Sequence, residues 1–241
     1  MKRVTLLLLL SAWLYADPTP EELLRVSDRS RGGIESGLQW EIEIKTSEDG
    51  HDSVRLFDVL ARDSDALATA TAPARNKGEI FLFNHNSLWF FKPGLRKPVG
   101  ISSRQKLTGQ TANGDIASTH YFRDYTGKIK GSDTIDGQPT YQLDLVAKDK
   151  SVTYDRILYW ISKTSKLGIK AEFLSLEGQP LKKAAFSYDN TLVVKNETIP
   201  FLSRMTISDA KNPSQKSILI YQKPKVINLN PILFDVNHLV R

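Results

Sequence analysis

The chain has 241 residues, with 33 lysines and arginines against 27 aspartates and glutamates, a formal net charge of +6, and no cysteine. The lack of cysteine excludes disulfides, thiolate metal sites and an acylated lipoprotein, which needs a cysteine directly after its signal. The basic residues are spread along the chain without a cluster, which excludes a nucleic-acid footprint and argues weakly for contact with anionic membrane surfaces.

The N-terminus has the order of a secretory signal. Lys2 and Arg3 precede an apolar run over residues 4–14, and Ala16 supplies a small residue before a polar stretch. The run of about 11 residues is shorter than the roughly 20 that cross a bilayer. We therefore expect residues 1–16 to be a cleaved signal peptide and the mature chain, with a net charge of +4, to be soluble in the periplasm.

A short helix is predicted next. Thr19 can cap it, Pro20 suits its first position, and the glycines at 32–33 end it. Residues 38–45 then alternate between apolar and polar side chains, which is typical of a strand with one buried face.

Further strands are predicted at 54–61, 67–71, 80–83 and 88–91, the last two as a hairpin around residues 84–87. Both faces of this hairpin are apolar, so something is expected to cover each face. We expect one face to carry Phe81, Phe83, Trp89 and Phe91, and the other Ile80, Leu82, Leu88 and Phe90.

Residues 92–114 are rich in glycine, proline and basic side chains, and we expect an irregular lid or binding loop there. Residues 115–125 are expected to form a short helix, with Asn113 as its cap. Strands then follow at 127–135, 140–147, 156–162, 169–176, 181–188, 199–208 and 217–221. Their near-regular spacing predicts one large curved antiparallel sheet within a single mature domain, residues 17–241.

No motif indicates catalysis. A nucleophile elbow, a phosphate-binding glycine loop and a dinucleotide fingerprint are all missing. Neither the four histidines nor the acids at 133, 136 and 144 have metal-ligand spacing, so we expect no metal and no cofactor; the histidines are His51, His85, His120 and His238.

Aromatic residues on the strands are the informative feature. They form either plain core or the apolar lining of a lipid cavity. The residues that we select as lining are Trp40, Ile42, Trp89, Phe91 and Tyr159. Their facing depends on register, because a slip of one residue moves every side chain to the other face.

Several segments in this order resemble the LolA-like group, the family of bacterial outer-membrane lipoprotein-sorting proteins. They are PARNKG at 73–78, LWFFKPG at 88–94, RKP at 96–98, IS at 101–102, GDIA at 114–117 and DY at 124–125, with residues 159–172 and Tyr188 further on. The resemblance implies a half-barrel of about eleven strands with helices on its concave side. Arg55, Arg62 and Arg75 are all candidates for the lid-locking arginine of the sorting chaperone.

The resemblance also implies a monomeric, non-catalytic carrier that moves a lipid, or the acyl chains of a lipoprotein, towards the outer membrane. Its partners would be an inner-membrane exporter and an outer-membrane acceptor. The alternative is an accessory or scaffold subunit of an inner-membrane lipid exporter. An enzyme is the third and least favoured hypothesis.

Overall fold

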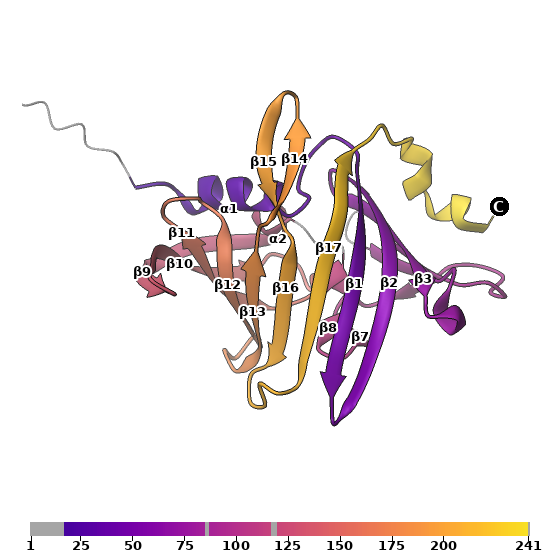
Figure 1. The fold of residues 1–241 in the computed structure, drawn as a ribbon, viewed down its shortest axis with the longest axis horizontal. Helices are drawn as coiled ribbons and strands as arrows, with labels where there is room; N and C mark the ends of the chain where they lie inside the picture. Colours follow the sequence, from indigo (N-terminus) through magenta and orange to yellow (C-terminus); the bar gives the residue numbers. More distant parts are fainter. Residues whose placement is uncertain (1–16, 85–86, 117–119, 241) are drawn as a thin grey trace, which may run out of the picture.

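The computed structural model describes residues 17–84, 87–116 and 120–240. The expected signal peptide and His85 lie outside these residues, so the structure does not bear on them. The described residues form one strongly curved antiparallel sheet of 13 strands, with the order β6-β5-β4-β3-β2-β1-β17-β16-β13-β12-β11-β10-β9 (Figure 1). The sheet is not closed, because its end strands β6 and β9 do not pair. The expected half-barrel is confirmed, with 13 strands rather than about eleven.

The first half of the sheet comprises β1 (Leu38–Glu48), β2 (His51–Arg62), β3 (Asp65–Ala72), β4 (Ile80–Asn84), β5 (Ser87–Phe91) and β6 (Val99–Ile101). The second half comprises β9 (Tyr125–Ile135), β10 (Gln138–Ala147), β11 (Arg156–Ser162), β12 (Gly168–Leu174), β13 (Pro180–Ser187), β16 (Arg204–Asp209) and β17 (Lys216–Val226). Two small hairpins stand apart, β7 (Lys106–Thr108) with β8 (Thr111–Ala112), and β14 (Asn190–Val194) with β15 (Glu197–Phe201).

Strand β1 shows why the sheet has an inside. Leu38, Trp40, Ile42 and Ile44 are at most 1% exposed, and the polar residues between them point outwards. The alternation in the sequence predicted this arrangement, because successive side chains of a strand point to opposite faces.

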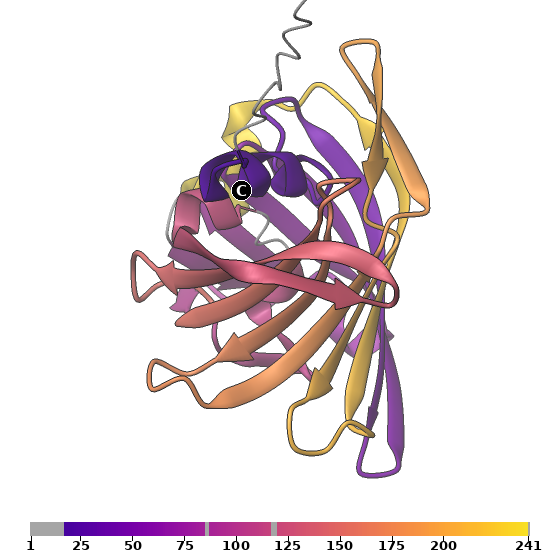
Figure 2. The same ribbon diagram turned by 90° about the vertical axis from the view of Figure 1, so that its left-hand side faces the viewer.

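Helix α1 (Pro20–Arg29) covers the concave side of the sheet (Figure 2). Thr19 and Glu22 form a capping box at its start, with Glu22 N donating to Thr19 Oγ1 at 3.2 Å. Its buried Leu23 and Leu24 join the main core. The predicted helix start is therefore confirmed, and the helix acts as a plug inside the half-barrel.

The prediction of an irregular loop over residues 92–114 is wrong in part. Strand β6 extends the main sheet, and β7, β8 and the 3-10 helix η2 (Asn113–Ile116) turn inwards. The backbone N of Gln110 donates to Ser217 Oγ at 2.8 Å, and Lys182 Nζ donates to Gln110 O at 2.6 Å. These contacts with distant strands give the stretch an order that its local composition does not indicate.

The predicted helix over residues 115–125 is also wrong in extent. The described part of this stretch holds the end of η2 and a short helix α2 (Tyr121–Asp124), with His120 at the N-cap. Asn113 does not cap α2; its side chain donates to Ser102 O at 3.0 Å. The predicted hairpin of residues 80–83 and 88–91 is confirmed, but its faces need a correction. Asn84 pairs with Ser87, so Leu82 stands opposite Trp89.

In this register, the residues of β5 lie on the opposite faces from those predicted relative to β4. Asn84 pairs with Ser87, so each odd-numbered residue of β4 stands opposite an even-numbered residue of β5 and lies on the same side of the sheet. Phe81, Phe83, Leu88 and Phe90 therefore share the concave face, and Trp89 and Phe91 lie with Leu82 on the convex face.

The strand predicted over residues 199–208 is two strands. Strand β15 ends at Phe201 in the separate β14–β15 hairpin, and β16 begins at Arg204 in the main sheet. Between them, the backbone N of Leu202 donates to Ser30 O at 2.9 Å. The turn of the β14–β15 hairpin has positive φ at Lys195 and Asn196, the arrangement of a tight two-residue hairpin turn.

The C-terminal residues 227–240, which we call the strap, cover the convex face over β4 and its neighbours. They include the 3-10 helices η3 (Pro231–Phe234) and η4 (Val236–Val240). Leu229 and Phe234 of the strap form a second buried cluster with Leu82 of β4, and Trp89 packs against it. The expectation that both faces of the β4–β5 hairpin are covered is thus confirmed.

Candidate functional site

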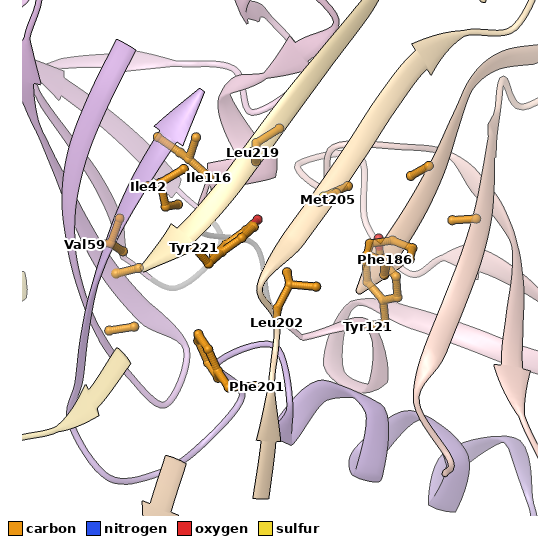
Figure 3. Packing of buried hydrophobic residues seen from close by; sticks show 14 of the residues in the cluster. Ile42, Val59, Ile116, Tyr121, Phe186, Phe201, Leu202, Met205, Leu219 and Tyr221 are labelled. Carbon is orange, nitrogen blue, oxygen red and sulfur yellow. The ribbon is translucent and has the colours of Figure 1, made fainter. Parts of the chain in front are cut away.

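The concave side of the sheet is filled by the chain itself. Side chains of α1, α2, η2 and the β14–β15 hairpin pack with the inward residues of the strands into one continuous cluster. Figure 3 shows Ile42, Val59, Leu219 and Tyr221 of the strands close to Ile116, Phe201 and Leu202. Any ligand that reaches the deep interior must therefore displace part of this plug.

A cleft of about 540 Å³ remains between the two ends of the open sheet, and we call it the mouth cleft. One wall comes from β4–β6 and the segment after β6, and the other comes from the end of α2 and the loop between β10 and β11. Its lining consists of Phe83, Ser87, Leu88, Trp89, Gly100, Ile101, Ser102, Ser103, Gln105, Arg123, Asp124, Ser151, Val152 and Thr153.

The mouth cleft is amphipathic. Phe83, Leu88, Ile101 and Val152 give it an apolar wall that is continuous with the main core. Arg123 lies at its edge, where Nε donates to Asp124 Oδ1 at 2.7 Å. Pockets that hold small ligands have a similar make-up, with an apolar lining, a few polar groups and volumes of roughly 300–1,000 Å³.

Hydrogen bonds tie the two walls of the mouth cleft together. Ser103 Oγ donates to Ser151 O at 2.6 Å, and Arg104 Nε donates to Val152 O at 2.9 Å. Arg104 also pairs with Asp155, with Nη1 at 2.7 Å from Oδ1. The segment after β6 thus bridges the gap between the ends of the sheet and fixes the width of the cleft.

A polar cluster lies deeper, beneath the end of α1. The Arg31 side chain is 6% exposed, and its guanidinium carbon lies 4.0 Å from the ring centroid of Tyr121. Asp28 Oδ2 accepts a hydrogen bond from the backbone N of Phe122 at 2.8 Å, which joins α1 to α2. Ser27 Oγ is 2.7 Å from the hydroxyl of Tyr159 on β11. Polar contacts therefore attach the plug to the sheet.

Burial perturbs the acids of this cluster. It raises the pKa of Asp28 from 3.8 to about 7, against the opposing effects of Arg31 and of two backbone amides. Burial also raises the pKa of Asp115, although Lys182 opposes this shift. Asp115 accepts hydrogen bonds from Ala112 N at 2.8 Å and from the Tyr154 hydroxyl at 3.0 Å.

The five residues selected as lining do not share one site. Trp40, Ile42 and Tyr159 are at most 1% exposed in the filled core. Trp89 lines the mouth cleft, and Phe91 follows it on the convex side of β5. The three core residues would meet a ligand only after the plug moves.

The three candidates for the lid-locking arginine differ in their contacts and exposure. Arg55 Nη2 donates to Glu79 Oε2 at 2.7 Å, and Arg55 Nη1 donates to Leu107 O of β7 at 3.4 Å. Arg62 is half-buried and Arg75 is exposed. Among the three, Arg55 is thus the one with a hydrogen bond to the inward-turning segment.

Sequence reasoning missed Arg31, Ser103 and Val152, because burial and proximity at these positions arise from contacts between distant segments. Within residues 17–84, 87–116 and 120–240, no group of three or more histidines and acids could hold a metal ion. No helix in the same residues is long and apolar enough to cross a membrane.

Comparison with known proteins places the fold. A family model described as an uncharacterized protein matches residues 62–241, and no curated protein matches the chain. The structure is similar to a LolA superfamily protein from Nitrosomonas europaea, with 30% identity, a TM-score of 0.82, and 92% of this chain and 100% of that chain covered.

Two further solved structures share the fold. A putative outer membrane lipoprotein-sorting protein domain from Vibrio parahaemolyticus is 20% identical with a TM-score of 0.75, covering 92% of this chain and 98% of its own. A DUF1329 family protein from Desulfovibrio piger is 17% identical with the same TM-score, covering 91% and 97%. Because the first relative shares both sequence and fold over nearly the whole chain, this protein belongs to the LolA superfamily.

Proposed function

We propose that the protein is a non-catalytic periplasmic carrier that holds an acyl chain of a lipid or lipoprotein in the mouth cleft, for transfer towards the outer membrane. The observation that carries this proposal is the amphipathic cleft at the open edge of a LolA-type sheet. The lipoprotein-sorting domain with the same fold supports the class of cargo, and the secretory pattern of residues 1–16 supports the compartment.

The energetics of the cleft suit an acyl chain. Each buried methylene contributes about 0.8 kcal/mol, so ten methylenes contribute roughly 8 kcal/mol. The conformational entropy that the acyl chain loses on binding opposes this gain. Ile101 and Val152 are half-buried and are therefore available to an entering chain. Of the lining residues selected from the sequence, Trp89 belongs to the cleft; Trp40, Ile42 and Tyr159 would extend the site inwards.

The test is the binding of a fluorescent alkyl probe to the mature chain, together with native mass spectrometry of protein isolated from the periplasm of an expressing bacterium. Val152→Asp places a carboxylate in the cleft and is expected to weaken probe binding at least tenfold, because the acyl chain would then desolvate a charge. Val146→Asp is the matched control on the exposed face of β10, where Val146 is 46% exposed, and should bind as the wild type does. Protein without bound lipid and without probe binding contradicts the carrier.

The filled interior favours a second candidate, an accessory or scaffold subunit of an inner-membrane lipid exporter. Such a subunit needs no cavity and docks through its surface. If a detergent-solubilised exporter is captured equally by the wild type and Val152→Asp, and neither binds the probe, the scaffold replaces the carrier.

A further inference from the structure

Arg31 is a buried cation with unused hydrogen-bond donors. Its side chain is 6% exposed, and Nε and Nη1 donate no hydrogen bond to any described residue. The nearest carboxylate oxygen is Asp28 Oδ1, which lies 4.0 Å from Nη1 and also has no hydrogen-bond partner there. A buried polar group without a partner is costly, so the position calls for a ligand group or for a function that compensates the cost.

Burial lowers the pKa of Arg31, but Tyr121, Tyr159 and Asp28 raise it well above its usual value, so the guanidinium stays charged. Arginine keeps its charge at all relevant pH values. Asp28 takes up a proton near neutral pH, because burial raises its pKa to about 7. Asp115 is also shifted upwards by burial, and its oxygens are already engaged by Tyr154 and by Ala112 N. The guanidinium instead contacts aromatic rings, those of Tyr121 at 4.0 Å and Phe186 at 5.5 Å.

Thr153 lies between this cation and the mouth cleft. A small cavity of about 10 Å³ touches Arg31, and Thr153 forms part of its wall. Thr153 also lines the mouth cleft, and its buried Oγ1 has no hydrogen-bond partner among the described residues. One threonine therefore separates an apolar cleft from a buried cation, and both sides of that wall carry unused hydrogen-bonding groups.

We infer that Arg31 is the head-group site of the acyl ligand, and that the ligand carries a single carboxylate, which passes Thr153 to the guanidinium while its chain stays in the mouth cleft. This inference rests on the proposed function and adds the chemistry of the cargo. A planar guanidinium offers parallel donors that match a carboxylate. The Tyr121 and Tyr159 hydroxyls lie beside the same guanidinium and interact with it electrostatically, and the Tyr159 hydroxyl also contacts Ser27 Oγ at 2.7 Å. The cavity beside Arg31 holds only about 10 Å³, and Asp115 also lines it, so a head group reaches the guanidinium only as Thr153 and its neighbours move apart.

The first experiment needs no variant. Dodecanoate, methyl dodecanoate and dodecyl phosphate compete for the mature chain against a fluorescent alkyl probe that has no acidic group. A hydrogen bond to a charged group favours binding by about tenfold to a hundredfold, so dodecanoate should displace the probe at least tenfold better than its methyl ester. Equal affinities overturn the head-group site and leave the carrier standing. Dodecyl phosphate binding tenfold tighter than dodecanoate overturns the carboxylate.

Variants at Arg31 test whether this residue causes the preference for dodecanoate over its methyl ester. Arg31→Met should lower the affinity for dodecanoate to that for the ester, with ester affinity within twofold of the wild type. Arg31→Lys keeps the charge but loses the planar fork, and should retain only part of the preference. Arg29→Met removes an exposed arginine two residues earlier, which pairs with Glu197, and should change nothing.

The controls separate a head-group role from a structural one. Circular dichroism and thermal unfolding establish that each variant is folded. If Arg31→Met does not fold, the preference of Arg31→Lys for dodecanoate over the ester is the deciding measurement. Loss of acid and ester binding alike in a folded Arg31→Met protein means that the arginine only supports the fold, and the inference fails. A wild-type protein that binds neither ligand nor the probe removes the carrier function as well.

Discussion

Replacing Asp28 with asparagine is expected to change how the stability of the protein depends on pH. The carboxyl is buried under α1, and its pKa rises from 3.8 to about 7 on folding. The folded state thus holds the proton more tightly than the unfolded chain does. The resulting stabilisation is fully present below pH 3.8 and is lost as the pH rises towards 7.

The size of the effect follows from the shift. One unit of pKa corresponds to about 1.4 kcal/mol, so the contribution of Asp28 falls by about 2 kcal/mol between pH 5 and pH 7, where the carboxyl is half ionised. Asparagine has the same shape, can still accept from the backbone N of Phe122, and does not titrate. The free energy of unfolding of Asp28→Asn, relative to the wild type, should therefore rise by about 2 kcal/mol over this interval and level off above it.

The assay is urea unfolding followed by tryptophan fluorescence at pH 5, 6, 7 and 8. Asp58→Asn is the matched control, since Asp58 is exposed on the outer face of β2, and its difference from the wild type should show no comparable change. If the two stability curves of Asp28→Asn and the wild type run parallel from pH 5 to pH 8, the buried carboxyl does not hold its proton and the reasoning is refuted.

Three further substitutions test the fold. Thr19→Ala removes the capping box and should lower the free energy of unfolding by about 1 kcal/mol, whereas Thr198→Ala at an exposed position should not; equal thermal midpoints contradict the cap. Gly168→Ala would place a Cβ 1.7 Å from the Tyr159 hydroxyl oxygen, so unfolding at lower urea is expected, and an unchanged midpoint refutes the packing. Phe234→Ala should cost about 3 kcal/mol and speed hydrogen exchange in the strap but not in β1; uniform exchange rates in both segments argue against a separately held strap.

The elements that could be predicted are those whose signals are local. The cap, proline and acids around Thr19 define the start of α1, and the alternation over residues 38–45 defines the buried face of β1. Turn residues such as the Asp136-Gly137 pair, both with positive φ, separate the later strands. Each signal lies within a few residues of the feature that it predicts.

The faces of β4 and β5 could not be fixed in this way. Residues 80–83 and 88–91 are all apolar, so the hydrophobic pattern does not show which face of each strand points inwards. The register is set by the tight connection between Asn84 and Ser87 and by the strap, which covers Leu82 from more than a hundred residues away. Trp89 and Phe91 consequently lie on the face opposite to Trp40.

The order of residues 92–114 and the burial of Arg31 escaped prediction for a related reason. A run of glycines and basic residues is typical of a loop, yet Gln110 is held by Ser217 and Lys182 from β17 and β13. An arginine before two glycines is typical of an exposed helix end. Arg31 becomes a buried cation because Tyr121 and Phe186, which are distant in the sequence, pack against its guanidinium.

A filled interior is consistent with a carrier, because an empty carrier must cover its apolar binding face. A large exposed apolar surface promotes association with other chains. The plug of α1, α2, η2 and the β14–β15 hairpin supplies this cover. A ligand that replaces part of the plug exchanges one set of apolar contacts for another. Affinity is then governed by the difference between the two sets and by the polar contacts that hold the plug.

Ser27→Ala tests this exchange. The substitution removes the buried contact between Ser27 Oγ and the Tyr159 hydroxyl, 2.7 Å apart, and should weaken the attachment of α1 by about 1 kcal/mol. If ligand binds a minor state with the plug displaced, that state becomes about fivefold more populated and the apparent affinity for the alkyl probe rises by the same factor. Ser132→Ala, on the exposed edge strand β9, should leave affinity and stability unchanged. A less stable Ser27→Ala protein with unaltered or weaker probe binding would show that ligand and plug do not compete, and that the mouth cleft binds without any movement of α1.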